Sequence, residues 1–376
     1  MPPMFRPVLR HFLLAGLALA VLGAGLQPAA AATPPPPYRV YLPTIAQAGL
    51  ALGGPVLPFG YGWGVFNWRN YWPSNQQYPA TTFNWVKITE NPDPAQLCGS
   101  FRLPYRVLLR LNKADANATP QQVADDAWTW AHNLLPGPTH CVDAFEIGNE
   151  PNLSMNGGYG GAVNPEKYAD QLCAAYTAIK ATDPAFVVVS AGLAPTAGLP
   201  DATQALTDTV FLRRMLTQIR DTHAGDAGAC FDVLGYHNYG FRAGYAADPA
   251  SPECAERACF RGAEAIFAIL YDEFGVAKRL WTTETGWMRD YVAGGCGAAP
   301  WAGVFAGFQR SDQGQAAELV GAYQYARAHW QWLGAIFMFN LDFDQRANVG
   351  VCDDEQGWFA VKGHSAEQAL EAMPKP

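Results

Sequence analysis

Two glutamates in the sequence stand where apolar runs end. Glu150 lies in FEIGNEPNL (residues 145–153), between an asparagine and a proline, and Glu284 lies in WTTETGW (residues 281–287). Because Gly, Asn and Pro are turn formers, one interpretation of the first stretch is a simple turn with a soluble glutamate. The other is a pair of carboxylates with complementary roles, one holding a proton and one staying ionised. The choice depends on the elements that would position the two side chains.

Short apolar runs with the character of strands recur eight times along the chain. Several are rich in Val, Leu and Ile throughout, as strands buried on both faces are. The expected strands cover residues 60–66, 84–88, 105–111, 141–147, 185–191, 231–237, 279–284 and 334–340.

Helical stretches lie between most of these strands. Thr119-Pro120 and Asn164-Pro165 each place a capping residue before a proline at the first helical position, and they predict helices to about residues 135 and 182. Further helices are expected over about 202–222, 261–275, 311–330 and 365–373. Residues 67–83 and 89–104 contain no convincing helix, so the first two helices should be short or irregular.

The alternation of strands and helices predicts the class of fold. Strand and helix repeated eight times indicate a single-domain (β/α)8 TIM barrel, a class of α/β protein, over residues 58–376. A doubly wound sheet is the competing architecture. No G-x-G-x-x-G follows the first strand, however, and eight strands fit a closed barrel better.

The N-terminal residues have the pattern of an export signal. Arg6 and Arg10 precede an apolar run over residues 12–26, and an Ala-rich segment offers a cleavage site near residues 30–32. An uncleaved N-terminal anchor is the alternative, although this run is shorter than the ~20 residues that span a membrane. Residues 1–32 are thus expected to be a signal peptide and residues 33–57 a proline-containing linker and N-terminal segment. We expect a secreted or surface-attached protein with no membrane span in the mature chain.

Charge and cysteine content narrow the class of partner. The formal net charge is −8, loss of the signal peptide would make it −10, and no basic patch is present, so nucleic acid is not expected as a partner. The eight cysteines of an exported chain predict disulfides, for which we expect 98 with 141, 173 with 230, 254 with 259 and 296 with 352, from the fold. The alternative is that some of the cysteines remain free, buried thiols. No C-x-x-C or H-E-x-x-H is present, and we expect no metal and no organic cofactor.

Polar residues gather at the predicted strand ends. In a barrel of this kind the active site lies at the carboxyl ends of the strands. The side chains expected there are Arg110 on the third strand, Glu150 on the fourth, His237 and Tyr239 on the sixth, Glu284 on the seventh and Asp342 after the eighth. Because strands four and seven face each other across the barrel mouth, the two glutamates can act on one bond.

At these positions the chain resembles a known group of enzymes. Asn149-Glu150-Pro151 after strand four, with Glu284 after strand seven, resembles glycoside hydrolase clan A, whose members are retaining glycosidases on (β/α)8 barrels. GYHNY (residues 235–239) is similar to the strand-six pattern of that clan, in which a histidine and a tyrosine line the site. The likeness covers most of the chain after residue 58. It implies that Glu150 is the general acid/base and Glu284 the nucleophile.

The resemblance also implies roles for the neighbouring residues. Asn149 would hydrogen-bond the sugar 2-hydroxyl, Tyr239 would donate to Glu284, and His237 would bind substrate or tune the pair. Otherwise His237 and Tyr239 are polar residues that are satisfied inside the barrel. Arg110 either contacts the nucleophile or forms a structural ion pair with Glu146.

The end of strand four raises a geometric problem. Strict alternation places Glu146, Gly148 and Glu150 on one side of the strand and turns Asn149 away. For Asn149 and Glu150 both to face a sugar, the strand must bulge or end at Gly148, where glycine permits it. Lys87, on the second strand, is interpreted as structural.

Aromatic residues are frequent near the predicted rim. Trp63, Trp68 and Trp287 are candidates for stacking on sugar rings, although about half of such rim aromatics should instead pack the core. Many clan members place a tryptophan on strand eight under the scissile sugar, whereas this chain has Phe337 and Phe339 there.

The expected function follows from the two glutamates. We expect a secreted, monomeric hydrolase that cleaves a β-glycosidic bond of an oligosaccharide or polysaccharide by double displacement. The alternatives are a catalytically silent carbohydrate-binding barrel and a transglycosylase that uses the same two glutamates.

Overall fold

The computed structural model describes residues 52–53, 60–65, 83–89, 105–134, 141–155, 157–346 and 348–375. The expected signal peptide, nearly all of the following segment, Trp68 and Cys98 lie outside these residues, and so does the side chain of Trp63.

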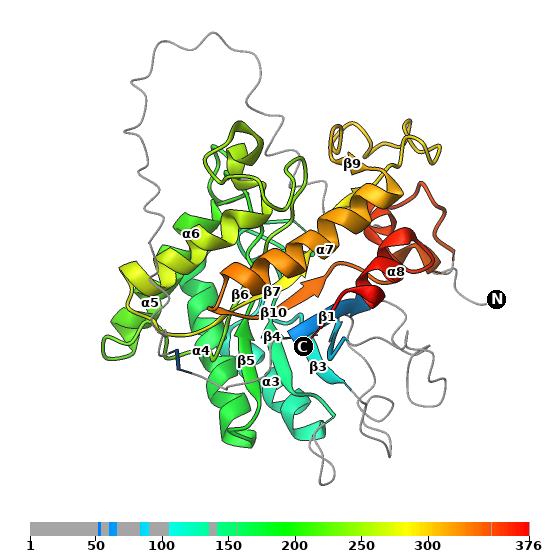
Figure 1. The fold of residues 1–376 in the computed structure, drawn as a ribbon. Helices are drawn as coiled ribbons and strands as arrows, with labels where there is room; N and C mark the ends of the chain where they lie inside the picture. The colour runs from blue at the N-terminus through cyan, green and yellow to red at the C-terminus, as the bar shows by residue number, and fades with distance from the viewer. Residues whose placement is uncertain are drawn as a thin grey trace, which may run out of the picture.

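Eight parallel strands form a nearly closed barrel (Figure 1). They are β1 (Gly60–Val65), β2 (Trp85–Ile88), β3 (Arg106–Leu111), β4 (Ala144–Ile147), β5 (Val187–Ser190), β6 (Leu234–His237), β7 (Leu280–Thr285) and β10 (Leu333–Met338). Their order is β5-β4-β3-β2-β1-β10-β7-β6, and parallel bridges between Val189 and Val233 and between Leu193 and Tyr236 join the two edge strands. The predicted (β/α)8 barrel is confirmed.

Helices surround the barrel where the sequence predicted them. The α-helices are α3 (Pro120–Asn133), α4 (Pro165–Thr182), α5 (Asp208–Thr222), α6 (Ala263–Ala268), α7 (Asp312–His329) and α8 (Ser365–Ala372). Short helices are η2 (Pro252–Arg257), η3 (Phe260–Gly262), η4 (Ile269–Glu273), η5 (Phe343–Gln345) and η6 (Glu355–Phe359). None of the helices in the described ranges is long and apolar enough to span a bilayer.

Two of the expected helices differ from the structure at their ends. The helix expected from residue 202 begins at Asp208, because the Thr207 side chain accepts the Val210 N–H and caps it there. The helix expected over 261–275 is a 3-10 turn, a short α-helix and a π-helical turn in succession.

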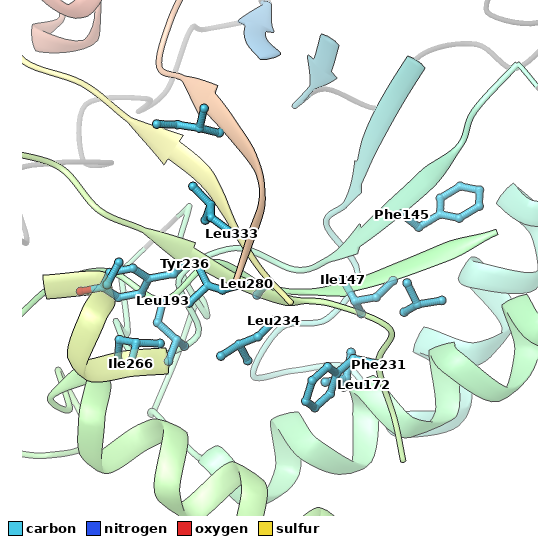
Figure 2. Packing of buried hydrophobic residues seen from close by; sticks show 14 of the residues in the cluster. Phe145, Ile147, Leu172, Leu193, Phe231, Leu234, Tyr236, Ile266, Leu280 and Leu333 are labelled. Atoms are coloured by element: carbon cyan, nitrogen blue, oxygen red, sulfur yellow. The ribbon is translucent and has the colours of Figure 1, made fainter. Parts of the chain in front are cut away.

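The strands separate two apolar layers. Outward-facing side chains such as Phe145 and Leu234 pack against the surrounding helices, and Figure 2 shows part of this layer, with Leu172 of α4 and Ile266 of α6. Inward-facing residues form a second core at the barrel centre, made of Trp85, Leu108, Ala144, Val187, Val189, Val233, Trp281, Ala335 and Phe337. Side chains are thus packed in layers inside the barrel, as in other TIM barrels.

A charged layer lies directly above this inner core. Two residues along from the inward-facing Trp85, Leu108 and Ala144, the same strand faces carry Lys87, Arg110 and Glu146. The fold therefore turns these charges into the barrel, toward the carboxyl ends of the strands.

Disulfides brace the helices and loops. Cys173 pairs with Cys230, Cys254 with Cys259 and Cys296 with Cys352, which confirms three of the expected pairings. The fourth involves Cys98, outside the described residues. The Cys296–Cys352 bond joins the loops after β7 and β10, beside the short strands β8 (Met288–Arg289) and β9 (Gln309–Arg310).

Candidate active site

The end of β4 brings Asn149 and Glu150 to the same site. The strand stops at Ile147, Gly148 adopts φ +88° and Glu150 adopts φ +40°. The positive φ of Gly148 costs little because glycine has no Cβ. The expected break at Gly148 is therefore present. Asn149 Oδ1 accepts a hydrogen bond from Arg110 Nη1 at 2.8 Å, so it faces the barrel mouth rather than turning away.

Glu284 lies at the end of β7 among donors and cations. Its Oε2 accepts a hydrogen bond from the Tyr239 hydroxyl at 2.7 Å, and its Oε1 lies 3.1 Å from Lys87 Nζ and 3.6 Å from Arg110 Nη1. Burial raises the pKa of this carboxyl, but the charges of His237, Lys87 and Arg110 outweigh burial and hold the pKa below its usual value. Glu284 is therefore suited to stay ionised.

Glu150 has a different environment. Its Oε1 lies 2.9 Å from His237 Nδ1, and the residue is 4% exposed. Burial raises the pKa of Glu150, and the negative charge of Glu284 adds to the rise, although His237 and Arg110 oppose it. The two carboxyls are thus shifted in opposite directions, the pattern of an acid paired with an ionised nucleophile.

His237 lies between the two carboxylates. Its Nδ1 is 2.9 Å from Glu150 Oε1 and 3.6 Å from Glu284 Oε2. Burial alone would lower the pKa of the imidazole, but Glu284, Glu146 and Glu150 outweigh it and raise the pKa to about 9. His237 is therefore expected to carry a positive charge at neutral pH.

The separation of the two glutamates constrains their chemistry. One carboxylate oxygen of each, together with a ring nitrogen of His237, lies within 4.8 Å of the others. Retaining glycosidases place their carboxyl groups about 5–5.5 Å apart, whereas inverting enzymes need about 6.5–9.5 Å to admit a water. Two carboxylates and a histidine could also hold a metal ion. Because Lys87 and Arg110 already place positive charge beside Glu284, a further cation is electrostatically disfavoured there, and we assign none.

A third carboxylate, that of Glu146, lies beneath Glu150 and Glu284. Glu146 Oε2 is 2.7 Å from Lys87 Nζ with both side chains fully buried, so the alternative of an Arg110–Glu146 pair is wrong. Arg110 instead contacts Glu284 and Asn149. Lys87 has more than the structural role expected of it, since it bridges Glu146 and Glu284. Lys87 and Glu146 could have been recognised in the sequence, because each is a lone charge at an inward position of a buried strand.

Gly192, in the segment after β5, makes room for this layer. Its N–H donates to Glu146 Oε1 at 3.2 Å. A Cβ at position 192 would lie 2.1 Å from His237 Cδ2 and 2.3 Å from His237 Nε2. The imidazole therefore occupies the space that any side chain at position 192 would need.

Two other residues expected to bind substrate, Trp287 and Asp342, are buried. Trp287 is fully buried, donates its indole N–H to Ala243 O at 2.9 Å and packs on Phe260, so it supports the core and presents no open face to a sugar. Asp342 is buried after β10, where it precedes η5. Phe337 belongs to the inner barrel core, and Phe339 packs edge-on against Tyr239.

Comparison with known proteins extends the structural result. No family model and no curated protein matches the chain. A glucosidase from Croceicoccus marinus is 16% identical over 85% of this chain and 68% of that one, with a TM-score of 0.51. The GH53 catalytic domain of Ignisphaera aggregans is 15% identical over 87% of this chain and 100% of that one, also with a TM-score of 0.51. At these identities the likeness shows the fold alone, in agreement with the (β/α)8 barrel described above.

Proposed function

We propose that the protein is a secreted retaining glycoside hydrolase that cleaves a β-glycosidic bond of an oligosaccharide or polysaccharide. The observation that carries this proposal is the Glu150–Glu284 pair. One oxygen of each carboxyl lies within 4.8 Å of one oxygen of the other, and the pKa values of the two carboxyls are shifted in opposite directions. That combination suits a proton donor and a nucleophile acting on one bond without a water between them.

In the first step Glu284 attacks the anomeric carbon. A bond forms between its carboxylate oxygen and that carbon as the bond to the leaving oxygen breaks, and Glu150 gives its proton to the leaving oxygen. The Tyr239 hydroxyl and the Lys87 ammonium, at 2.7 and 3.1 Å from Glu284, favour the ionised form that makes the attack.

In the second step Glu150, now ionised, takes a proton from water. The water oxygen attacks the anomeric carbon, the bond to Glu284 breaks and the sugar leaves with its original configuration. Asn149 Nδ2 donates one hydrogen bond to Gly157 O. We assign its second N–H as a hydrogen-bond donor to the sugar 2-hydroxyl. We retain Trp63 and Trp68 as predicted stacking residues.

The proposed location rests on two features. The signal-peptide pattern of residues 1–32 predicts export, and the three disulfides of the described chain fit an oxidising compartment. The protein is proposed to act outside the cell as a monomer.

The test is turnover of a panel of aryl β-glycosides and polysaccharides by the wild type, Glu150→Ala and Glu284→Ala. We expect wild-type turnover, large losses in both variants, and covalent labelling of Glu284 by a 2-fluoro glycoside of an accepted sugar, read by mass spectrometry. Product analysis by NMR should show retained configuration, and added alcohols should reveal any transglycosylation.

Two outcomes would overturn the proposal. Glycan binding without turnover of any substrate would favour the silent binding barrel. Label on another residue of an active enzyme would remove Glu284 as nucleophile. Asp232→Asn is the matched control, because it also deletes a carboxylate charge that faces a lysine (Lys180, 2.6 Å), at the opposite end of the barrel.

A further inference from the structure

One of the three disulfides in the described part of the chain has a histidine against one of its sulfurs. Cys173, on α4, is bonded to Cys230, which lies just before β6. His223, at the end of α5, places Nε2 at 3.6 Å and Nδ1 at 3.9 Å from Cys230 Sγ. A ring nitrogen and both sulfurs lie within 4.8 Å of one another. A disulfide and a group that can carry positive charge therefore share one site, away from the two catalytic glutamates.

The other nitrogen of the His223 ring fixes where a second proton must go. The Thr222 hydroxyl donates to Gln218 O at 2.7 Å, so its oxygen accepts from His223 Nδ1 at 2.9 Å. Ile219 O, at 3.2 Å from the same nitrogen, is a carbonyl oxygen and can only accept. Nδ1 is therefore a donor in both charge states of the ring. A second proton lies on Nε2, the nitrogen nearer to Cys230 Sγ.

The two sulfurs differ in their access to solvent. Cys173 is partly exposed on α4, whereas Cys230 is only 1% exposed. A thiolate arriving from solvent therefore reaches Cys173 more readily, and Cys230 becomes the leaving group. A thiolate that leaves beside an imidazolium is stabilised by the opposite charge, and a better leaving group speeds exchange. Access and charge thus favour the same direction of attack.

The other two described disulfides provide an internal comparison. Among the residues that the structure describes, no histidine contacts a sulfur of Cys254–Cys259 or of Cys296–Cys352. Cys254 and Cys259 are both buried, and so is Cys296. Neither bond therefore combines an accessible sulfur with a histidine beside the leaving sulfur.

We propose that the Cys173–Cys230 disulfide is an exchange site for small-molecule thiols, at which Cys173 is attacked and His223 stabilises Cys230 as the leaving thiolate. The sulfur of the incoming thiolate forms a bond to Cys173 Sγ as the bond to Cys230 Sγ breaks, and the electron pair stays on Cys230. The proton that the incoming thiol has released is taken up through solvent by His223. A second thiolate then attacks the incoming sulfur, which leaves a small-molecule disulfide and two reduced cysteines.

Opening this bond releases α4 from the segment that leads into β6. The bond joins residues 57 positions apart, across α4, β5 and α5. Because a disulfide stabilises a protein mainly by restricting the unfolded chain, and more so for longer loops, its opening lowers the stability of the fold. The stability of the barrel therefore responds to thiols in the surroundings. This inference does not rest on the proposed glycosidase function.

The first test is the rate at which dithiothreitol opens each disulfide of the intact, folded protein. Samples are quenched with acid, alkylated in denaturant and analysed by peptide mass spectrometry. We expect Cys173–Cys230 to open about tenfold or more faster than the other two described bonds. In early samples treated with reduced glutathione instead, the adduct should be on Cys173. Opening no faster than at Cys254–Cys259 and Cys296–Cys352, or glutathione mainly on Cys230, would overturn the proposal.

The second test separates the chemistry of His223 from simple shielding of the sulfur. His223→Phe keeps a ring beside Cys230 but has no N–H, and because His223 is exposed the variant should fold. We expect opening of Cys173–Cys230 to slow about threefold or more, with the other two rates unchanged. His329→Gln is the matched control, since it removes another exposed histidine from a helix end, one that packs on Tyr325. A wild-type or faster rate in His223→Phe would remove His223 from the proposal.

Discussion

Two lysine–carboxylate pairs of nearly equal length lie at opposite ends of the barrel. At the carboxyl end, Lys87 Nζ is 2.7 Å from Glu146, and both side chains are fully buried. At the amino end, Lys180 Nζ is 2.6 Å from Asp232, and the side chains are 21% and 12% exposed. Each carboxylate also accepts one backbone N–H, that of Gly192 in the first pair and that of Val188 in the second.

The difference between the pairs lies in their neighbours. Asp232 links the start of β6 to β5, as Asp143 links the start of β4 to β3 by accepting the Val107 N–H at 2.9 Å. These carboxylates reach water and act as local braces. Glu146 instead belongs to a buried cluster with His237 and, through Lys87, Glu284. In a low-dielectric site such charges act strongly on one another, and the charge of Lys87 helps to hold the pKa of Glu284 below its usual value.

Variants at the two ends of the barrel should differ most in their catalytic rates. Glu150→Gln removes the acid proton, and we expect a loss of about 10²–10⁴-fold in kcat/KM on substrates with poor leaving groups. The loss should be much smaller for aryl glycosides whose leaving group needs no proton. Steady-state kinetics over a series of aryl substituents measures this. Asp232→Asn should retain wild-type rates throughout, and an equal loss on every leaving group would contradict the acid role.

The next effect should be on stability. Lys87→Met leaves Glu146 as an unpaired buried charge, and breaking such a pair costs about 3–5 kcal/mol of unfolding free energy. Lys180→Met breaks a pair that reaches water and should cost about 1 kcal/mol or less. Urea unfolding followed by tryptophan fluorescence compares the two variants. Equal shifts of the unfolding midpoint would show that burial does not distinguish the ends.

The smallest effect should be the pH dependence of stability. The pKa of His237 is raised to about 9 in the folded protein, above the unfolded value of about 6.5. The stabilisation from His237 is therefore complete below pH ~6.5 and is lost as the pH rises through about 9, a change of roughly 2–4 kcal/mol. Unfolding free energies measured from pH 6 to 10 should show this fall in the wild type and in Asp232→Asn. His237→Gln should flatten it, and a wild-type slope in His237→Gln would contradict the assignment.

The sequence predicted much of this site because strand ends are readable from pattern. Apolar runs marked where β4 and β7 stop, and Gly148 marked where the alternation must break. The inward direction of the Lys87 and Glu146 side chains could also be predicted, since each residue lies two positions after an inward apolar residue. The pairing of Lys87 with Glu146 could not be predicted. The alternation along a strand tells which side a residue faces, but the stagger of neighbouring strands in a closed barrel decides which residues lie at the same level.

Trp287 shows the same limit for apolar residues. Its position three residues after Glu284 suggested a rim aromatic, yet the ring is fully buried, donates its N–H to Ala243 O and packs on Phe260. Adjacent residues at the end of a strand leave in different directions, and loop packing decides which of them reaches solvent. That packing depends on distant segments, which local pattern does not contain.

The missing side chain at position 192 has a consequence for which substitutions the site can accept. Gly192 has no left-handed backbone that would require glycine, and the constraint on it is the space filled by the imidazole of His237 and the hydroxyl of Thr283. A larger residue at 192 and a histidine at 237 exclude each other. In this fold the two positions are therefore coupled: a side chain at 192 displaces the imidazole from its place between Glu150 and Glu284.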